Sequence, residues 1–162
     1  MDTQAIFGLQ FGLSLVLWSL IAKWWLAPWL QKKSQHQALA CLTLPHAFRF
    51  MGMVFLVPGV VAQSLPHAFA TSAAYGDLAA ALLALLALIA LRSGWAWALA
   101  LVWLFNIVGT VDLVNAVRQQ NVVPHLGAAW YIPTAFVPLL LVTHVMIFAR
   151  LLGRRQVASN TE

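Results

Sequence analysis

A five-residue sequence occurs twice in this chain, on either side of an apolar segment. Leu44-Pro45-His46-Ala47-Phe48 and Leu65-Pro66-His67-Ala68-Phe69 begin 21 residues apart. As a helix, that distance corresponds to about 31 Å at ~1.5 Å per residue, close to the ~30 Å hydrocarbon core of a bilayer. Between the copies, the segment from Phe50 to Ala62 is apolar apart from Pro58-Gly59, and Arg49 precedes it. This pattern predicts a membrane-crossing helix with an arginine about one turn inside.

The low charge of the whole chain supports the same interpretation. Of its 162 residues, 62% are hydrophobic and only 8% are charged, whereas soluble domains carry about 25% charged residues. So few charges cannot cover a water-exposed surface, and we expect an all-α integral membrane protein with a single domain over residues 1–155. The net charge of +5 would suggest nucleic acid in a soluble protein. Here most basic residues lie at predicted helix ends, so we expect membrane lipids and no nucleic acid as partners.

Five apolar segments predict a bundle of five membrane spans. They cover about residues 5–26, 39–63, 77–91, 95–117 and 130–152, with a surface loop at 63–76 and a disordered tail at 156–162. Pro58 is expected to kink the outer half of the 39–63 span, because proline lacks a backbone donor and clashes with the preceding turn. The 77–91 span is the shortest, and four spans remain an alternative if it does not cross.

The basic residues near the span ends predict the orientation. With five spans the two termini lie on opposite sides, and Arg118 is the basic residue on the side of the N-terminus. The other side carries seven: Lys23, Lys32, Lys33, Arg92, Arg150, Arg154 and Arg155. By the positive-inside rule the N-terminus is outside and the C-terminus is cytoplasmic. We expect a bacterial-type inner (plasma) membrane.

Ionisable side chains within spans cost about 2.5–3.5 kcal/mol each on insertion scales, and are functional candidates by default. Arg49 could clamp an anion, pair with Asp112, or snorkel to the headgroups. A simple depth estimate separates Arg49 from Asp112 by ~12 Å of helix rise. His144 could act as a general acid–base or proton relay, or could only hydrogen-bond between helices. The predicted catalytic residues are Asp112 and His144. The predicted ligand-binding residues are Arg49, Asn106, His46, Asn115 and Tyr131.

No cofactor is predicted. Haem held by two histidines needs both at matching depth, and His46, the one intramembrane partner for His144, is expected nearer the cytoplasmic surface. His67, His125 and Asp77 are expected to gather on the outer side, and they are the candidates for a divalent metal ion. The HxxxH, CxxC and HExxH spacings that would support such a site do not occur in the sequence.

Three functions are compatible with these residues. The first is a polar pocket between the 39–63, 95–117 and 130–152 spans that binds, and could transform, a small lipophilic or amphipathic ligand. The second is an oligomeric transporter or proton-coupled carrier, assembled through Gly8 and Gly12 or through Ala80, Ala84 and Ala87. The third is a non-catalytic accessory or scaffold subunit. The sequence favours the first, because the polar candidates fall on three spans, but it does not decide whether the protein is an enzyme.

Overall fold

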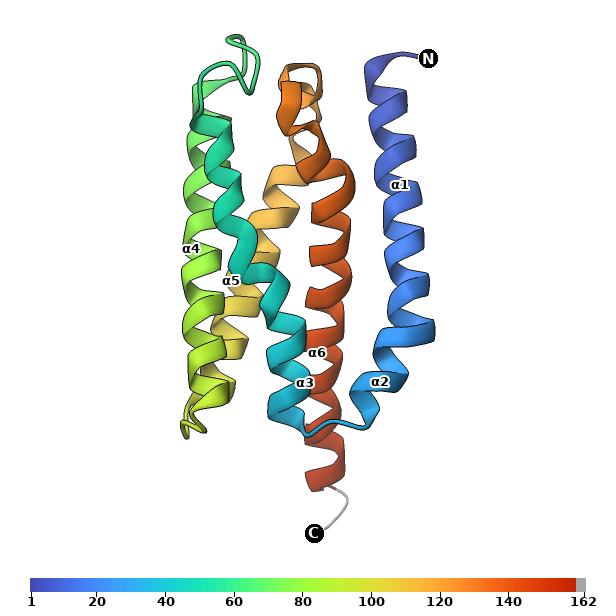
Figure 1. Ribbon diagram of the computed structural model, residues 1–162, viewed down its shortest axis with the longest axis vertical. Coiled ribbons are helices and arrows are strands. Elements are labelled where there is room, and N and C mark those ends of the chain that lie inside the picture. Colours follow the sequence, from blue (N-terminus) through green and yellow to red (C-terminus); the bar gives the residue numbers. More distant parts are fainter. Residues whose placement is uncertain (160–162) are drawn as a thin grey trace.

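The computed structural model describes residues 1–159 and is a bundle of long helices lying side by side (Figure 1). Five helices are long and apolar enough to cross a membrane: Thr3–Gln31, Gln35–Leu56, His67–Arg92, Ala98–Arg118 and Gly127–Gly153. The described part of the chain begins at one end of the bundle and finishes with its last helix at the other, and we call these the N-terminal end and the C-terminal end. The predicted all-helical bundle with five such segments is therefore confirmed.

The first long helix extends beyond the predicted 5–26 in both directions. Asp2 caps α1 (Thr3–Ile21) by accepting a hydrogen bond from the Ala5 amide at 2.6 Å, which stabilises an earlier start. A π-helical turn, η1 (Ala22–Leu26), then leads into α2 (Ala27–Gln31). This turn directly precedes Pro28, which lacks the amide that would continue the regular helical pattern. The helix therefore passes the proline without ending.

The second long helix changes type halfway. It begins as α3 (Gln35–Thr43), where Ser34 and Gln37 form a capping box, and continues as the 3-10 helix η2 (Leu44–Leu56). The helix ends at Leu56, not at residue 63, because Val57 is extended, as residues before proline usually are. The predicted kink at Pro58 is therefore wrong. That proline lies in the turn beyond the helix, beside Gly59 with a φ of 83°.

The third long helix is much longer than predicted. α4 (His67–Arg92) starts ten residues before the expected residue 77, so most of the segment predicted as a surface loop is helical. This segment is rich in alanine, which favours helix, and its buried residues Ala70, Ala73 and Ala74 pack inside the bundle. Further along α4, Ala80, Ala84 and Ala87 are buried within this chain. By contrast, a Cβ added at Gly8 or Gly12 would meet open space.

The last two long helices are joined by short irregular turns at the N-terminal end. After α5 (Ala98–Arg118) come two 3-10 turns, η3 (Gln120–His125) and η4 (Gly127–Trp130), and a π-helical turn, η5 (Ile132–Phe136). α6 (Val137–Ser159) then runs to the C-terminal end. It includes the first four residues of the tail expected to be disordered at 156–162, and the last three lie outside the described residues.

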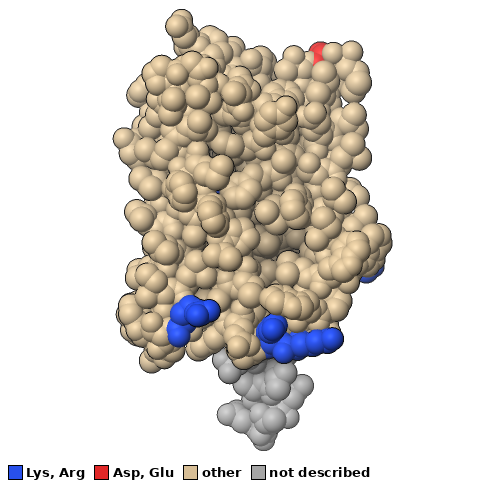
Figure 2. Space-filling model, viewed as in Figure 1, with Lys and Arg blue, Asp and Glu red and all other residues tan. Residues whose placement is uncertain are grey.

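The surface of the bundle is mainly apolar. Large hydrophobic side chains are exposed on every long helix, among them Leu13, Phe50, Leu82, Val111 and Val145. In the view of Figure 2, Lys and Arg gather near the C-terminal end and leave a broad region without charge. An apolar surface of this extent is unfavourable in water, and it matches the length and hydropathy of the five long helices.

Candidate functional site

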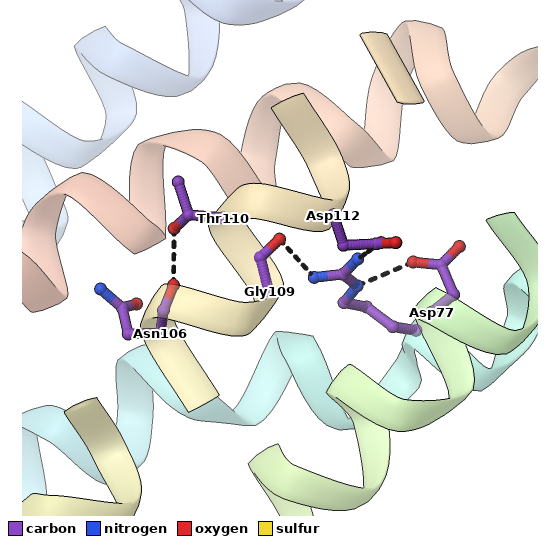
Figure 3. Close-up of polar contacts among 6 residues, drawn as sticks. Asp77, Asn106, Gly109, Thr110 and Asp112 are labelled. Carbon is purple, nitrogen blue, oxygen red and sulfur yellow. Dashed lines mark hydrogen bonds and ion pairs between the residues drawn. The ribbon is translucent and has the colours of Figure 1, made fainter. Parts of the chain in front are cut away.

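Arg49 lies at the centre of a buried group of charges contributed by three helices. From η2, its Nε donates to Asp77 Oδ1 of α4 at 2.8 Å, and its Nη2 donates to Asp112 Oδ2 of α5 at 2.5 Å (Figure 3). Its Nη1 donates to the Gly109 carbonyl oxygen at 3.0 Å. The Arg49 side chain is fully buried, whereas those of Asp77 and Asp112 are 13% and 19% exposed. We call Arg49, Asp77 and Asp112 the ionic cluster.

The expected separation of ~12 Å between Arg49 and Asp112 is wrong, and the observed helix boundaries explain why. The second long helix starts at Gln35 and not at residue 39, and α5 starts at Ala98 and not at residue 95. With ~1.5 Å per residue in α3 and ~2.0 Å in η2, Arg49 lies roughly 24 Å beyond Gln35, of which the 3-10 form adds only about 2.5 Å. Asp112 lies about 21 Å beyond the start of α5 at ~1.5 Å per residue. The two residues therefore lie at similar depth, and Arg49 is paired inside the bundle.

Asp77 is the member of the cluster that sequence reasoning misplaced. It was expected at the beginning of a helix, as an N-terminal acid or metal ligand, but it lies ten residues into α4. Two glycines make room for the carboxylates: a Cβ at Gly52 would collide with the Asp77 side chain, and one at Gly76 would collide with the Asp112 carboxylate. Glycines close to charged residues, Gly52 near Arg49 and Gly76 beside Asp77, were the available sequence signal.

A second group of polar side chains lies beside the cluster. It is uncharged when its two histidines are neutral. His46 Nε2 lies 2.9 Å from Thr143 Oγ1, and the Thr143 hydroxyl itself donates to backbone carbonyl oxygens of α6. The threonine oxygen therefore accepts from an Nε2–H of His46. Similarly, Asn106 Oδ1 accepts from His144 Nδ1 at 2.7 Å, while Asn106 Nδ2 donates to the His144 carbonyl oxygen at 3.3 Å. All four residues are buried, and we call them the neutral layer.

The two histidines of the neutral layer touch each other. Their ring centroids are 4.1 Å apart, which leaves no space for a porphyrin between the rings. The two groups meet at Gly109, where an added Cβ would lie 2.8 Å from His144 Cε1 and 2.9 Å from Arg49 Nη1. Among the described residues, His46 Nδ1 and His144 Nε2 are buried without a hydrogen-bond partner.

Three other predicted residues, Asn115, His67 and His125, do not hydrogen-bond to the ionic cluster or the neutral layer. Asn115 is exposed on α5, in a shallow groove with Val111 and Arg118. His67 Nδ1 contacts Thr71 Oγ1 at 3.3 Å, and His125 Nδ1 contacts Ser64 Oγ at 2.9 Å. The three residues considered for a metal ion, His67, His125 and Asp77, do not come together. Within the described part of the chain, groups of three or more His, Cys, Asp or Glu suitable for a metal ion do not occur.

Besides the shallow groove on α5, which Asp112 also lines, two hollow spaces border the ionic cluster. The first, the inner cavity, has a volume of about 50 Å³ and is lined by Asp77, Asp112 and largely apolar side chains, including Phe7, Phe55 and Phe69. The second, the lateral groove, has a volume of about 380 Å³ and is lined by Arg49, Asp77 and apolar residues of η2 and α6.

The lateral groove opens at the side of the bundle. Three of its lining residues, Phe48, Met51 and Tyr131, are 50%, 53% and 72% exposed. The predicted residue Tyr131 therefore does line a space next to Arg49. Asp77, Ile132 and Val137 line both the groove and the inner cavity, so the two spaces adjoin at these three side chains.

The fold and the site together define an all-helical bundle of five long apolar helices with a buried ionic cluster beside two cavities. The chain belongs to the family described as Domain of unknown function (DUF8737), which matches residues 6–152. Neither a curated protein nor a solved structure matches the chain. The function must therefore be argued from the geometry of the ionic cluster.

Proposed function

We propose that this protein is a polytopic membrane protein that binds a small amphipathic ligand at the ionic cluster. The polar head of the ligand contacts Asp77 and Asp112, and its apolar part lies in the lateral groove. The chain crosses a bacterial-type inner membrane five times, with the N-terminus outside and the C-terminus in the cytoplasm. The basic residues near the C-terminal end support this orientation.

The observation that carries this proposal is that both carboxylates paired with Arg49 also border hollow spaces. Burying an ion pair costs desolvation energy that the attraction between the charges does not reliably offset. A cluster that only joined helices would be expected to lie in closed packing. An ionic cluster that costs free energy and borders two cavities is better explained by a ligand that contacts it.

The geometry also changes which residues we assign to binding. Arg49 donates to two carboxylates and a carbonyl oxygen, so we do not propose it as an anion clamp; it holds the two acids in place. The charged residues come from η2, α4 and α5, while α6 contributes apolar walls such as Val137 and Leu140. His144 lies in the sealed neutral layer, and a catalytic role for Asp112 and His144 stays a prediction.

The lateral groove suggests how the ligand enters. Its mouth is formed by Tyr131 and by apolar side chains on the outer surface of η2, which belongs to a helix long and apolar enough to cross a membrane. An amphipathic molecule dissolved in the bilayer can therefore reach Asp77 sideways, with its chain against Met51, Phe136 and Leu140. Apolar walls with a few convergent polar groups are the usual composition of a ligand site.

Blocking the groove tests the proposal. The purified protein in zwitterionic nanodiscs is titrated with radiolabelled ten-carbon amphiphiles carrying cationic, neutral or anionic heads, and empty nanodiscs are subtracted. Saturable binding of at least one amphiphile is expected, and Met51→Trp should weaken it by tenfold or more. Phe50→Trp is the matched control, since Phe50 is similarly exposed on η2 but does not line the groove. Absence of saturable binding for all three heads would overturn the proposal.

A further inference from the structure

The charge of the ionic cluster restricts the head group of the ligand. With all three groups ionised, one guanidinium and two carboxylates carry a net charge of −1. Arg49 stays protonated in proteins, and it is fully buried between the two acids. A neutral head would leave one uncompensated negative charge in a poorly hydrated site, and an anionic head would raise it to −2. A monocation would bring the site to neutrality, which is the least costly state for buried charges.

The inner cavity has acceptors suited to such a cation. Arg49 uses Asp77 Oδ1 and Asp112 Oδ2, so the second oxygen of each carboxylate does not bond to the arginine. Asp77 and Asp112 come from different helices and both line the cavity. An ammonium group there can donate to a carboxylate without displacing Arg49, and such charge-assisted hydrogen bonds are about twice as strong as neutral ones.

The rest of the cavity wall is also suited to an ammonium group. Phe7, Phe55 and Phe69 line it together with the two acids, and Phe55 and Phe69 pack edge to face with ring centroids 5.7 Å apart. Aromatic rings attract cations within ~6 Å of the ring, and aromatic cages recognise alkylated ammonium groups. Carboxylates combined with aromatic rings therefore favour an ammonium over a strongly hydrated metal cation.

The volume of the cavity sets an upper limit on the head. A water-sized group takes up roughly 10–15 Å³ of such a cavity, so about 50 Å³ holds about four of them. A primary ammonium or a trimethylammonium fits this limit, and a triethylammonium does not. The lateral groove adjoins the cavity at Asp77, Ile132 and Val137, so a chain attached to the head reaches the groove by passing between these side chains. A chain attached to the nitrogen would therefore lie in that groove.

We propose that the ligand is an alkylammonium: a small monocationic amine head in the inner cavity, between Asp77, Asp112 and the three phenylalanines, with an apolar chain in the lateral groove. This inference rests on the proposed function and names the class of ligand for the same site. The charge of the head group and the binding of the chain in the lateral groove are tested by different comparisons. One can therefore be wrong while the other holds.

The test compares heads on one chain length, in the same nanodiscs. Decylammonium and decyltrimethylammonium are expected to bind at least tenfold more tightly than decanol, decanoate and decyltriethylammonium. Asp112→Asn removes the excess negative charge and should reduce the preference for decylammonium over decanol by tenfold or more. Asp2→Asn is the matched control, because Asp2 caps α1 far from the cluster and asparagine caps equally well.

Each result is decisive. If decanol or decanoate binds more tightly than decylammonium, the cationic head is wrong while amphiphile binding at the groove stands. If the preference for decylammonium is unchanged in Asp112→Asn, the inner cavity is not the site of the head. Should Asp112→Asn fail to fold, Asp77→Asn makes the same change of charge on a different helix, and the same criterion applies. If none of the amphiphiles binds saturably, the proposed function itself fails.

Discussion

The ionic cluster and the neutral layer are neighbours in one bundle, yet they differ in charge and in exposure. The neutral layer joins η2, α5 and α6 through uncharged hydrogen bonds, and all four of its residues are buried. The ionic cluster joins η2, α4 and α5, and its two acids are partly exposed to hollow spaces. We infer that the neutral layer holds the helices together, and that the carboxylates of the ionic cluster remain accessible to a ligand.

The largest expected effect comes from removing the arginine. Arg49→Ala leaves two buried carboxylates facing each other without a cation, and breaking buried ion pairs in this way costs about 3–5 kcal/mol. The free energy of unfolding in mixed micelles, measured by denaturant titration, should fall by that amount. Arg92→Ala, at an exposed arginine near the C-terminal end, is the control and should stay within ~0.5 kcal/mol. A loss below ~1 kcal/mol for Arg49→Ala would contradict the pairing.

Removing the carboxylates should be strongly non-additive. Asp77→Asn or Asp112→Asn alone removes the excess charge and leaves Arg49 with one partner, so each is expected to cost less than the ~3–5 kcal/mol of leaving a buried charge unpaired. The double variant leaves Arg49 buried without an anion and should lose about 3–5 kcal/mol. A double-mutant cycle measures this coupling directly. Additive effects of the two substitutions would show that the arginine is not shared.

Gly109 tests whether the two groups are in contact. In Gly109→Ala the new Cβ would press on His144 and on Arg49 Nη1 at once. Overpacking of this kind costs ~1–3 kcal/mol, and we expect the upper part of that range because both groups must shift. Gly8→Ala is the matched control, since its Cβ meets open space. Equal unfolding free energies for the two variants would place the groups further apart than described.

The smallest expected effect is a difference in stability between substitutions of two asparagines on α5. Asn106→Leu removes the acceptor of His144 in the neutral layer, and leaving one neutral buried donor unpaired costs ~1–3 kcal/mol. Asn115→Leu, on the exposed face of the same helix, should change stability by less than ~0.5 kcal/mol. Thermal unfolding of both variants measures the difference. Neither substitution should alter the preference for decylammonium, because neither changes the charge of the ionic cluster.

Much of the fold could be predicted from hydropathy alone. The five long apolar segments and the positions of Arg49, Asp112 and His144 within them follow from the order of residues, because charges are rare in this chain. The errors came from local geometry. The early start of the second long helix changed the depth of Arg49, and the early start of α4 placed Asp77 inside the bundle. Neither start is visible in hydropathy, because helix starts depend on capping residues such as Ser34 and on helix propensity.

The repeated five-residue sequence shows most directly that local sequence does not determine burial. In the first copy His46 is buried while Leu44 and Phe48 are 53% and 50% exposed; in the second, His67 is exposed while Leu65 and Phe69 are 8% and 6% exposed. Local propensity is the same for both copies. The first begins η2 in the middle of the bundle and the second begins α4 at its N-terminal end, so different neighbours surround them.

The sequence by itself therefore determined that this protein forms five apolar helices carrying a few ionisable groups. Only the tertiary structure decided which of those groups meet. Burial depends on the surfaces that other helices present, and no local pattern in a single chain contains that information.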